Sequence, residues 1–254
     1  MGSYENPNWQ KKWAKVKRRL ELTKIQKELI IGSLLGDGTM RVGKGSINAN
    51  FKVEQGIVQK DLVFWKYSIL RSLVFTEPKI SYRYNELRQP YPKSWWFRTV
   101  RHPQITDIYH QFYTGDGFRT GRKIIPANIS NYINPFTMAI WIMDDGSYGK
   151  HNLHLSTYSF SIEEIGLLEK SILECLGISF KHYRDRDKGF RMYCSKTETA
   201  KLVPIVKDFI LPSLTYKIGY RNPVTTEALC QEGSQLSLNF NYLNTPTPIL
   251  VQVG

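Results

Sequence analysis

Two aspartates, each followed by glycine, stand at matching places in two similar segments of this chain. Asp37 follows the apolar segment 30–36, and Asp145 follows the apolar segment 138–144, about a hundred residues later. Carboxylates are ligands that Mg²⁺ prefers in proteins. Two of them at a pseudo-twofold axis could hold ions that activate water and neutralise charge in phosphodiester hydrolysis. The matched pair therefore predicts a metal-dependent hydrolytic site.

A single Asp-Gly pair is most often only a turn, so the prediction depends on the two copies occurring together. A third such sequence, 115–117, follows Tyr113 and Thr114 rather than small and aliphatic residues. We interpret it as a loop. His151 and His154 offer no alternative metal site, because the further ligands that a histidine-based site requires are missing.

Helix signals precede both aspartates. Thr23, with Gln26 three residues later, forms a capping-box pattern that predicts the start of the first helix. Asn134 followed by proline predicts the start of the second. We expect the glycine after each acid to end its helix in the left-handed conformation.

The same order of elements follows each aspartate. Alternating apolar and polar residues over 46–54 and 152–158 predict strands with one buried face. Further helices are expected over 62–73 and 162–176, further strands over 79–86, 94–100, 178–184 and 189–194, and a closing helix in each half. The predicted fold is α+β, a pseudo-twofold duplication of the order αββαββα.

This repeat predicts four parts. A basic N-terminal extension covers 1–22 and contains a helix over 11–19. The first half covers 23–130 and the second 131–221. A C-terminal extension of 222–254 has no basic residues.

Composition favours a nucleic-acid partner. The 254 residues are 41% hydrophobic and 22% charged, which is typical of a globular protein. The net charge is +13, and basic residues are interleaved with aromatics and amides, as on surfaces that meet phosphates and bases. A basic surface without a partner is the alternative. Three scattered cysteines and the lack of a membrane-spanning or signal segment predict a reducing, intracellular setting without membrane contact.

Segments 30–38 and 138–146 resemble the two signature motifs of single-chain, intron-encoded LAGLIDADG homing endonucleases, and the resemblance covers roughly residues 23–221. It implies that Asp37 and Asp145 bind Mg²⁺ at the scissile phosphates, with two or three ions in all. The backbone carbonyls of Gly36 and Asp144 could complete the coordination. The Asp144 side chain is expected to be a neighbour of the site rather than a ligand.

Two further features follow from the resemblance. Lys123 and Lys217 lie in segments similar to those that carry the active-site basic residue of each half, which implies a catalytic role. The motif helices are expected to pack together along small residues. Gly32, Ser33 and Gly36 supply these in the first copy, whereas the second has Ala139 and a bulky Ile140.

In this family two antiparallel sheets form a saddle over the major groove of DNA, where outward side chains can read base edges. The alternation predicts the DNA-binding residues Asn48, Asn50, Lys52, Glu54, Ser81, Arg83 and Arg98 in the first half, and Asn152, His154, Ser156, Lys181, Arg191 and Tyr193 in the second.

The resemblance implies a monomeric, site-specific endonuclease that makes a staggered double-strand break in a long, weakly palindromic DNA target and so promotes intron mobility. A mitochondrion, another organelle or a prokaryotic cytoplasm would be its location. One alternative is a splicing maturase that binds intron RNA. Another is a non-catalytic DNA-binding regulator, although both motif acids are retained. An unrelated RNA-binding module lacks the expected signatures.

Overall fold

The computed structural model describes residues 19–115 and 121–220. Most of the predicted N-terminal helix, positions 116–120 of the third Asp-Gly region, and the C-terminal extension lie outside the described residues.

The first half follows the predicted order. Its elements are α2 (Lys24–Leu35), β1 (Thr39–Val42), β2 (Ala49–Gly56), α3 (Lys60–Ile69), β3 (Lys79–Tyr84), β4 (Pro90–Arg98) and α4 (Pro103–Phe112). The four strands form one antiparallel sheet in the order β1-β2-β4-β3.

The second half repeats this order. Its elements are α5 (Pro135–Asp145), β5 (Gly146–Gly149), β6 (Asn152–Ser156), α6 (Ile162–Leu176), β7 (Phe180–Arg184), β8 (Phe190–Cys194) and α7 (Lys196–Val206). Short 3-10 segments follow α7, and the last of them is Pro212–Ile218. The sheet order β5-β6-β8-β7 matches that of the first half, so the predicted duplicated α+β fold is confirmed.

Three of the predicted helix starts are confirmed, whereas α3 begins at Lys60 rather than at the predicted position 62. Thr23 caps α2 with a reciprocal bond to Gln26, and Ser161 and Glu164 form the same motif at the start of α6. The Asn134 side chain accepts a hydrogen bond from the Thr137 amide at the start of α5. These local bonds satisfy backbone amides that the first helical turn cannot pair internally.

The predicted left-handed helix ends are wrong. Gly146 has an extended backbone (φ −71°, ψ 146°), and Gly38 is not among the glycines with positive φ. Close approach of backbone atoms requires glycine here. A Cβ on Gly38 would lie 2.6 Å from the Ser33 carbonyl oxygen, and one on Gly146 would lie 2.5 Å from that of Ile142.

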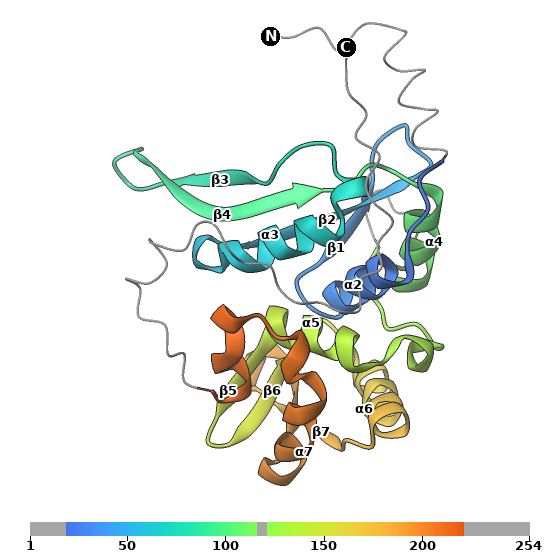
Figure 1. Cartoon of the computed structure of the whole chain (residues 1–254), viewed down its shortest axis with the longest axis vertical. Helices are drawn as coiled ribbons and strands as arrows, with labels where there is room; N and C mark the ends of the chain where they lie inside the picture. The colour runs from blue at the N-terminus through green and yellow to red at the C-terminus, as the bar shows by residue number, and fades with distance from the viewer. Residues whose placement is uncertain (1–18, 116–120, 221–254) are drawn as a thin grey trace, which may run out of the picture.

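Helices α2 and α5 lie side by side at the centre of the molecule, where the two halves meet (Figure 1). Every residue from Leu29 to Leu35 and from Phe136 to Asp144 is buried. Helices that are apolar on nearly all sides belong in the interior of a fold. The apolar character that marks the two motifs is therefore explained by their central position.

Only the first motif segment supplies the glycines that allow these two helices to pack closely. A Cβ on Gly32 would lie 2.9 Å from the Ile140 Cβ, and one on Gly36 would lie 2.6 Å from the Asp144 Cβ. The bulky Ile140 is accommodated because α2 supplies a glycine opposite it. Small residues on one helix are therefore enough for close approach.

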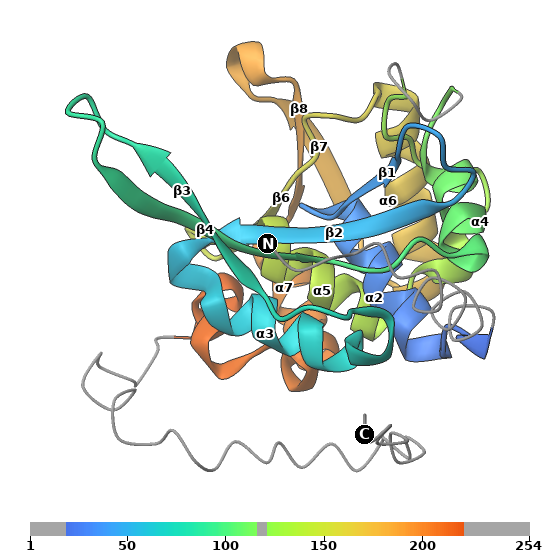
Figure 2. The same ribbon diagram turned by 90° about the horizontal axis from the view of Figure 1, so that it is seen from above.

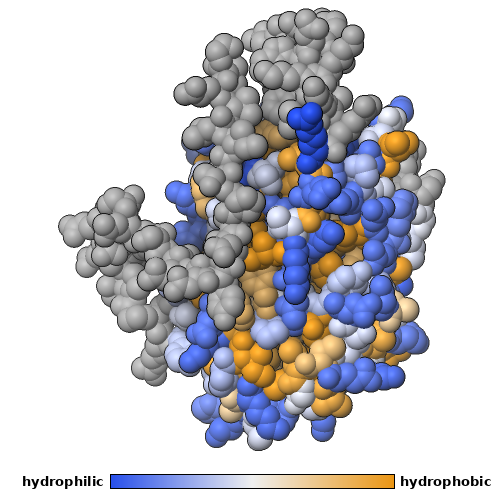
Figure 3. Space-filling view, turned by 45° about the vertical axis from the view of Figure 1, so that its right-hand side comes forward, coloured by the Kyte–Doolittle hydropathy of each residue, from blue (hydrophilic) through white to orange (hydrophobic). Residues whose placement is uncertain are grey.

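The two sheets are covered by helices on one face. Seen from above, the β3–β4 and β7–β8 hairpins diverge and project away from α3 and α7 (Figure 2). Hydrophilic and hydrophobic side chains are interspersed on the face shown in Figure 3. Within the described ranges, no helix is both long and apolar enough to cross a membrane.

Candidate active site and nucleic-acid interface

The ends of the central helices bring the two predicted acids into one site. Asp37 follows Gly36, the residue that caps the end of α2, and Asp145 is the last residue of α5. Burial and, to a smaller extent, the charges of Asp37 and Asp144 together raise the pKa of Asp145 from 3.8 to about 7. The site thus concentrates negative charge, which a divalent cation would relieve.

Each acid has a lysine beside it. The Lys123 ammonium donates to the Gly36 carbonyl at 2.7 Å, and the Lys217 ammonium donates to the carbonyls of Met143 (2.6 Å) and Asp144 (2.8 Å). Gly36 and Asp144 precede the two acids at equivalent positions, so the lysines are related by the pseudo-symmetry. Burial lowers the pKa of both lysines, and the neighbouring aspartates oppose this shift.

The donor set suits a hard cation that completes its coordination with substrate. Among the described side chains, no three from His, Cys, Asp and Glu gather as a closed metal site. Mg²⁺ is commonly bound by one or two carboxylates together with waters and substrate phosphates. Asp37 and Asp145 fit this pattern. The predicted carbonyl ligands of Gly36 and Asp144 already accept bonds from the two lysines, although a carbonyl has a second lone pair.

The Asp144 side chain makes contacts that the sequence did not reveal. Its carboxylate is fully buried and accepts bonds from Lys66 Nζ (2.6 and 2.8 Å) and Gln55 Nε2 (3.0 Å). Gln55 Nε2 also donates to Asp37 Oδ2 at 3.0 Å, and Lys66 Nζ donates to Ser33 Oγ at 2.7 Å. Burial raises the pKa of Asp144, and the Lys66 ammonium opposes this.

A signal for two of these missed residues was present in the sequence. Gln55 continues the inward-facing positions 49, 51 and 53 of its strand, and Lys66 follows the apolar run 62–65. A polar side chain on a buried face requires a partner, so such positions are candidates for a site.

The outward face of the first sheet carries most of the DNA-binding residues predicted for the first half. The alternation is confirmed for β2, where Ala49, Phe51 and Val53 are buried and the residues between them are partly exposed. The predicted strand start at position 46 is wrong, since β2 begins at Ala49 and Ile47 is exposed. Asn48 therefore precedes the strand, and its side-chain oxygen accepts a bond from Thr106 Oγ1 at 3.2 Å.

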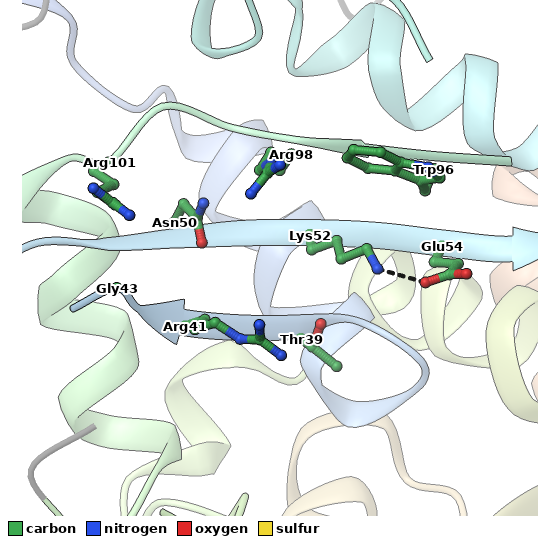
Figure 4. A pocket seen from close by; sticks show the side chains of 9 residues that line it. All are labelled: Thr39, Arg41, Gly43, Asn50, Lys52, Glu54, Trp96, Arg98 and Arg101. Carbon is green, nitrogen blue, oxygen red and sulfur yellow. Dashed lines mark hydrogen bonds and ion pairs between the residues drawn. The ribbon is translucent and has the colours of Figure 1, made fainter. Parts of the chain in front are cut away.

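Strand pairing gathers further basic groups on this face. Arg41 lies opposite Asn50, and Arg98 lies opposite Lys52. With Arg101 these side chains line a pocket whose remaining lining residues are Thr39, Gly43, Glu54 and Trp96 (Figure 4). Sequence reasoning missed Thr39, Arg41, Trp96 and Arg101, because pairing between distant strands brings them there.

Glu54 is the acidic member of this pocket. Its carboxylate pairs with Lys52 and Lys93 and accepts a bond from Ser94 Oγ at 2.6 Å. Partial burial opposes the effect of these partners, yet they lower the pKa of Glu54 to about 2.

An irregularity between β3 and β4 leaves Lys93 without a partner in the strand register, while Ser81 and Arg83 continue the unbroken alternation of β3.

The second sheet presents its predicted residues together. His154 pairs with Tyr193, Ser156 with Arg191, and Lys181 with Tyr193, so these side chains share one face. Asn152 lies at the end of the same sheet, opposite Gly149. The rings of His154, Tyr183 and Tyr193 contact one another at centroid distances of 5.8–6.1 Å. This face has more rings and fewer cations than its counterpart.

Comparisons with known proteins agree with this architecture. The model of the LAGLIDADG DNA endonuclease family matches residues 27–202. The chain is 27% identical over 214 residues to DNA endonuclease I-ChuI of Chlamydomonas applanata, covering 80% of this chain and 98% of the relative. It is 26% identical over 206 residues to cytochrome b mRNA maturase bI2 of Debaryomyces hansenii, covering 78% and 75%.

A solved structure shares the fold. The homing endonuclease I-WcaI, bound to its DNA recognition sequence, matches with a TM-score of 0.75 and 23% identity, over 87% of this chain and 96% of that one.

Proposed function

This chain belongs to the LAGLIDADG DNA endonuclease family, and we propose that it is a site-specific homing endonuclease that makes a double-strand break in DNA. The observation that carries the proposal is the pairing of Asp37 and Asp145 at adjoining helix ends, with a lysine bonded to the carbonyl that precedes each acid. A non-catalytic DNA-binding regulator would not need this doubled arrangement of acids and bases.

We propose Asp37 and Asp145 as the side chains that hold the metal. A bound divalent cation would supply charge neutralisation at the phosphate and an activated water. The two carboxylates meet opposite strands of a duplex because the two halves are related by pseudo-twofold symmetry. This relationship accounts for a break in both strands by a single chain acting as a monomer.

Lys123 and Lys217 would accept a proton from the attacking water or stabilise the negative charge that develops at each scissile phosphate. Burial lowers the pKa of both lysines and so favours the neutral amine, which can accept a proton from an attacking water. In the protonated form either lysine stabilises the negative charge of the phosphorane. Their bonds to the helix-end carbonyls hold both ammonium groups beside the acids.

The outward faces of the two sheets would bind the target. The Arg41, Lys52, Arg98 and Arg101 cluster suits phosphates and guanine edges. The second face is built differently, with rings, Arg191 and Lys181. Two half-sites read by such different faces support a long target that is only weakly palindromic.

The experiment is cleavage of a DNA library with Mg²⁺, using the wild type, Asp37→Asn and Asp145→Asn. The library holds randomised sequences and candidate intron-insertion sites. We expect the wild type to cut both strands of a specific target, and each variant to nick it or leave it intact. Retained DNA binding in Ca²⁺ would show that the variants are folded. Full cutting by both variants would contradict the assignment of the acids.

Maturase activity is the second candidate, favoured by the similarity to the maturase bI2 over most of that protein. Specific binding of an intron RNA, without cutting of any DNA by the wild type, would support it. An intron-encoded origin would place the protein in an organelle or a prokaryotic cytoplasm.

A further inference from the structure

Asp144 belongs to the second half of the molecule, but its side chain is bonded within the first. It stands in α5 directly before Asp145, and its carboxylate is 0% exposed. Lys66 of α3 donates to both carboxylate oxygens and to Ser33 Oγ of α2. The ammonium group thus has three acceptor atoms, and the Lys66 side chain is 1% exposed.

Gln55 connects this buried pair to the first acid. Its Nε2 lies 3.0 Å from Asp144 Oδ1 and 3.0 Å from Asp37 Oδ2. An amide nitrogen has two hydrogens, so it can donate one to each carboxylate. Asp37 is an exposed residue just beyond a helix end, and this bond restrains a carboxylate that solvent alone would leave free to rotate.

Within residues 19–115 and 121–220, the second acid has no equivalent support. Thr39 pairs with Lys52 and Ser147 pairs with His154, so the position equivalent to Gln55 is Thr157. Thr157 is buried and donates its hydroxyl to the Phe190 carbonyl at 2.9 Å. The bonded chain from Lys66 through Asp144 and Gln55 therefore serves Asp37 alone.

We propose that Asp144 is a positioning residue for Asp37. Held by Lys66, it fixes the Gln55 amide, which in turn holds Asp37 in the orientation that receives the metal. The second half thereby orients the acid of the first. A buried ion pair stabilises a fold no more than apolar residues of similar volume would. Stability therefore does not account for the Lys66–Asp144 pair, whereas orientation of Asp37 does. This inference rests on the proposed nuclease function.

Two double variants separate positioning from folding. Lys66→Met with Asp144→Asn removes the buried charges and keeps an amide oxygen that can accept from Gln55. Lys66→Met with Asp144→Leu removes the charges and the acceptor. Both replace a buried pair without leaving one charge alone, so both should fold. Thermal unfolding verifies this.

Metal affinity is the deciding measurement. We expect the Asn variant to bind Ca²⁺, measured by calorimetry on the protein with its DNA target, within about threefold of the wild type. The Leu variant should bind about tenfold more weakly, as is typical when a partner of a metal ligand is lost. The Mg²⁺ concentration for half-maximal cleavage should shift in the same ratio. Gln55→Met, which keeps the ion pair, should behave like the Leu variant.

A metal-free signature tests the bond itself. The protein is labelled with ¹⁵N-glutamine, and the Gln55 side-chain amide signal is assigned by its loss in Gln55→Met. This amide should be protected from hydrogen exchange in the wild type and in the Asn variant. It should be unprotected in the Leu variant. Equal Ca²⁺ affinity and equal protection in the two double variants would overturn the proposal. If the wild type cuts no DNA, the nuclease function fails, while the amide signal still reports whether Asp144 holds Gln55.

Discussion

Gly36, at the end of α2, and Asp144 of α5 directly precede the two site acids, and they face each other across the centre of the molecule. A Cβ added to Gly36 would lie 2.6 Å from the Asp144 Cβ and 3.0 Å from its Oδ2. These two positions are equivalent in the two halves, yet one holds a glycine and the other an aspartate. The glycine leaves the space in which Asp144 meets Lys66, so the asymmetry of the helix pair creates the buried network.

Gly36→Ala should therefore destabilise the protein. The added methyl group must displace the Cβ of Asp144, and overpacking of this kind lowers the free energy of unfolding by about 1–3 kcal/mol. Thermal unfolding measures the loss. Gly166→Ala is the control, because no atom lies within 4 Å of its Cβ and alanine favours a helix by up to about 1 kcal/mol. An unchanged unfolding midpoint in Gly36→Ala would contradict this packing.

Lys123→Met and Lys217→Met should each slow cleavage by about 10²-fold or more, since each removes a group that transfers a proton or stabilises charge. Because the two lysines bond to carbonyls of different halves, we expect each variant to slow one strand more than the other. Single-turnover assays with each strand labelled separately provide the measurement. Binding in Ca²⁺ should change little. Lys207→Met, at an exposed lysine, should cut normally, and equal activity of all three variants would exclude a catalytic role.

The metal-free protein should show a pH dependence that originates in Asp145. Its pKa is raised from 3.8 to about 7, chiefly by burial. A carboxyl group that binds its proton more tightly when folded contributes its full stability below about pH 4, and this is lost as the pH rises through 7. Asp145→Asn mimics the neutral acid. In a chelator, it should raise the unfolding midpoint by about 3 °C more at pH 8 than at pH 5.

The other ionisable groups are the same in both proteins, so their contributions cancel from this difference. A midpoint shift that is the same at both pH values would show that Asp145 is ionised in the folded, metal-free protein. Added Mg²⁺ should reduce the pH dependence of the wild type, because a bound cation favours the ionised acid.

The pocket arginines should determine the salt dependence of DNA binding. Arg101→Gln is expected to weaken binding and to reduce the slope of log affinity against log salt by about 1 if it contacts one phosphate. Titrations at several salt concentrations in Ca²⁺ measure both. Lys196→Gln, at the start of α7, should leave the slope unchanged. A slope unaffected by Arg101→Gln would place DNA away from this pocket.

Much of the architecture was predictable because its signals are local. The capping residues Thr23 and Asn134 determine where the two central helices begin, and the alternation at 49–54 and 152–157 determines which strand face is buried. The repeat of the same order of elements identified the duplication. The two acids were recognisable because each follows an apolar helix in a matched segment.

The tertiary structure alone determined which side chains meet. Lys66 and Asp144 are 78 residues apart, and Gln55 and Asp144 are 89 apart, so no local pattern could pair them. Register determined that Arg41 joins Asn50 and that the strand begins after Asn48. Hydrogen bonds and ion pairs act over a few ångströms, whereas periodicity and capping act along the chain. The sequence therefore determined the elements and the two acids, and packing of the two halves decided the network that holds them.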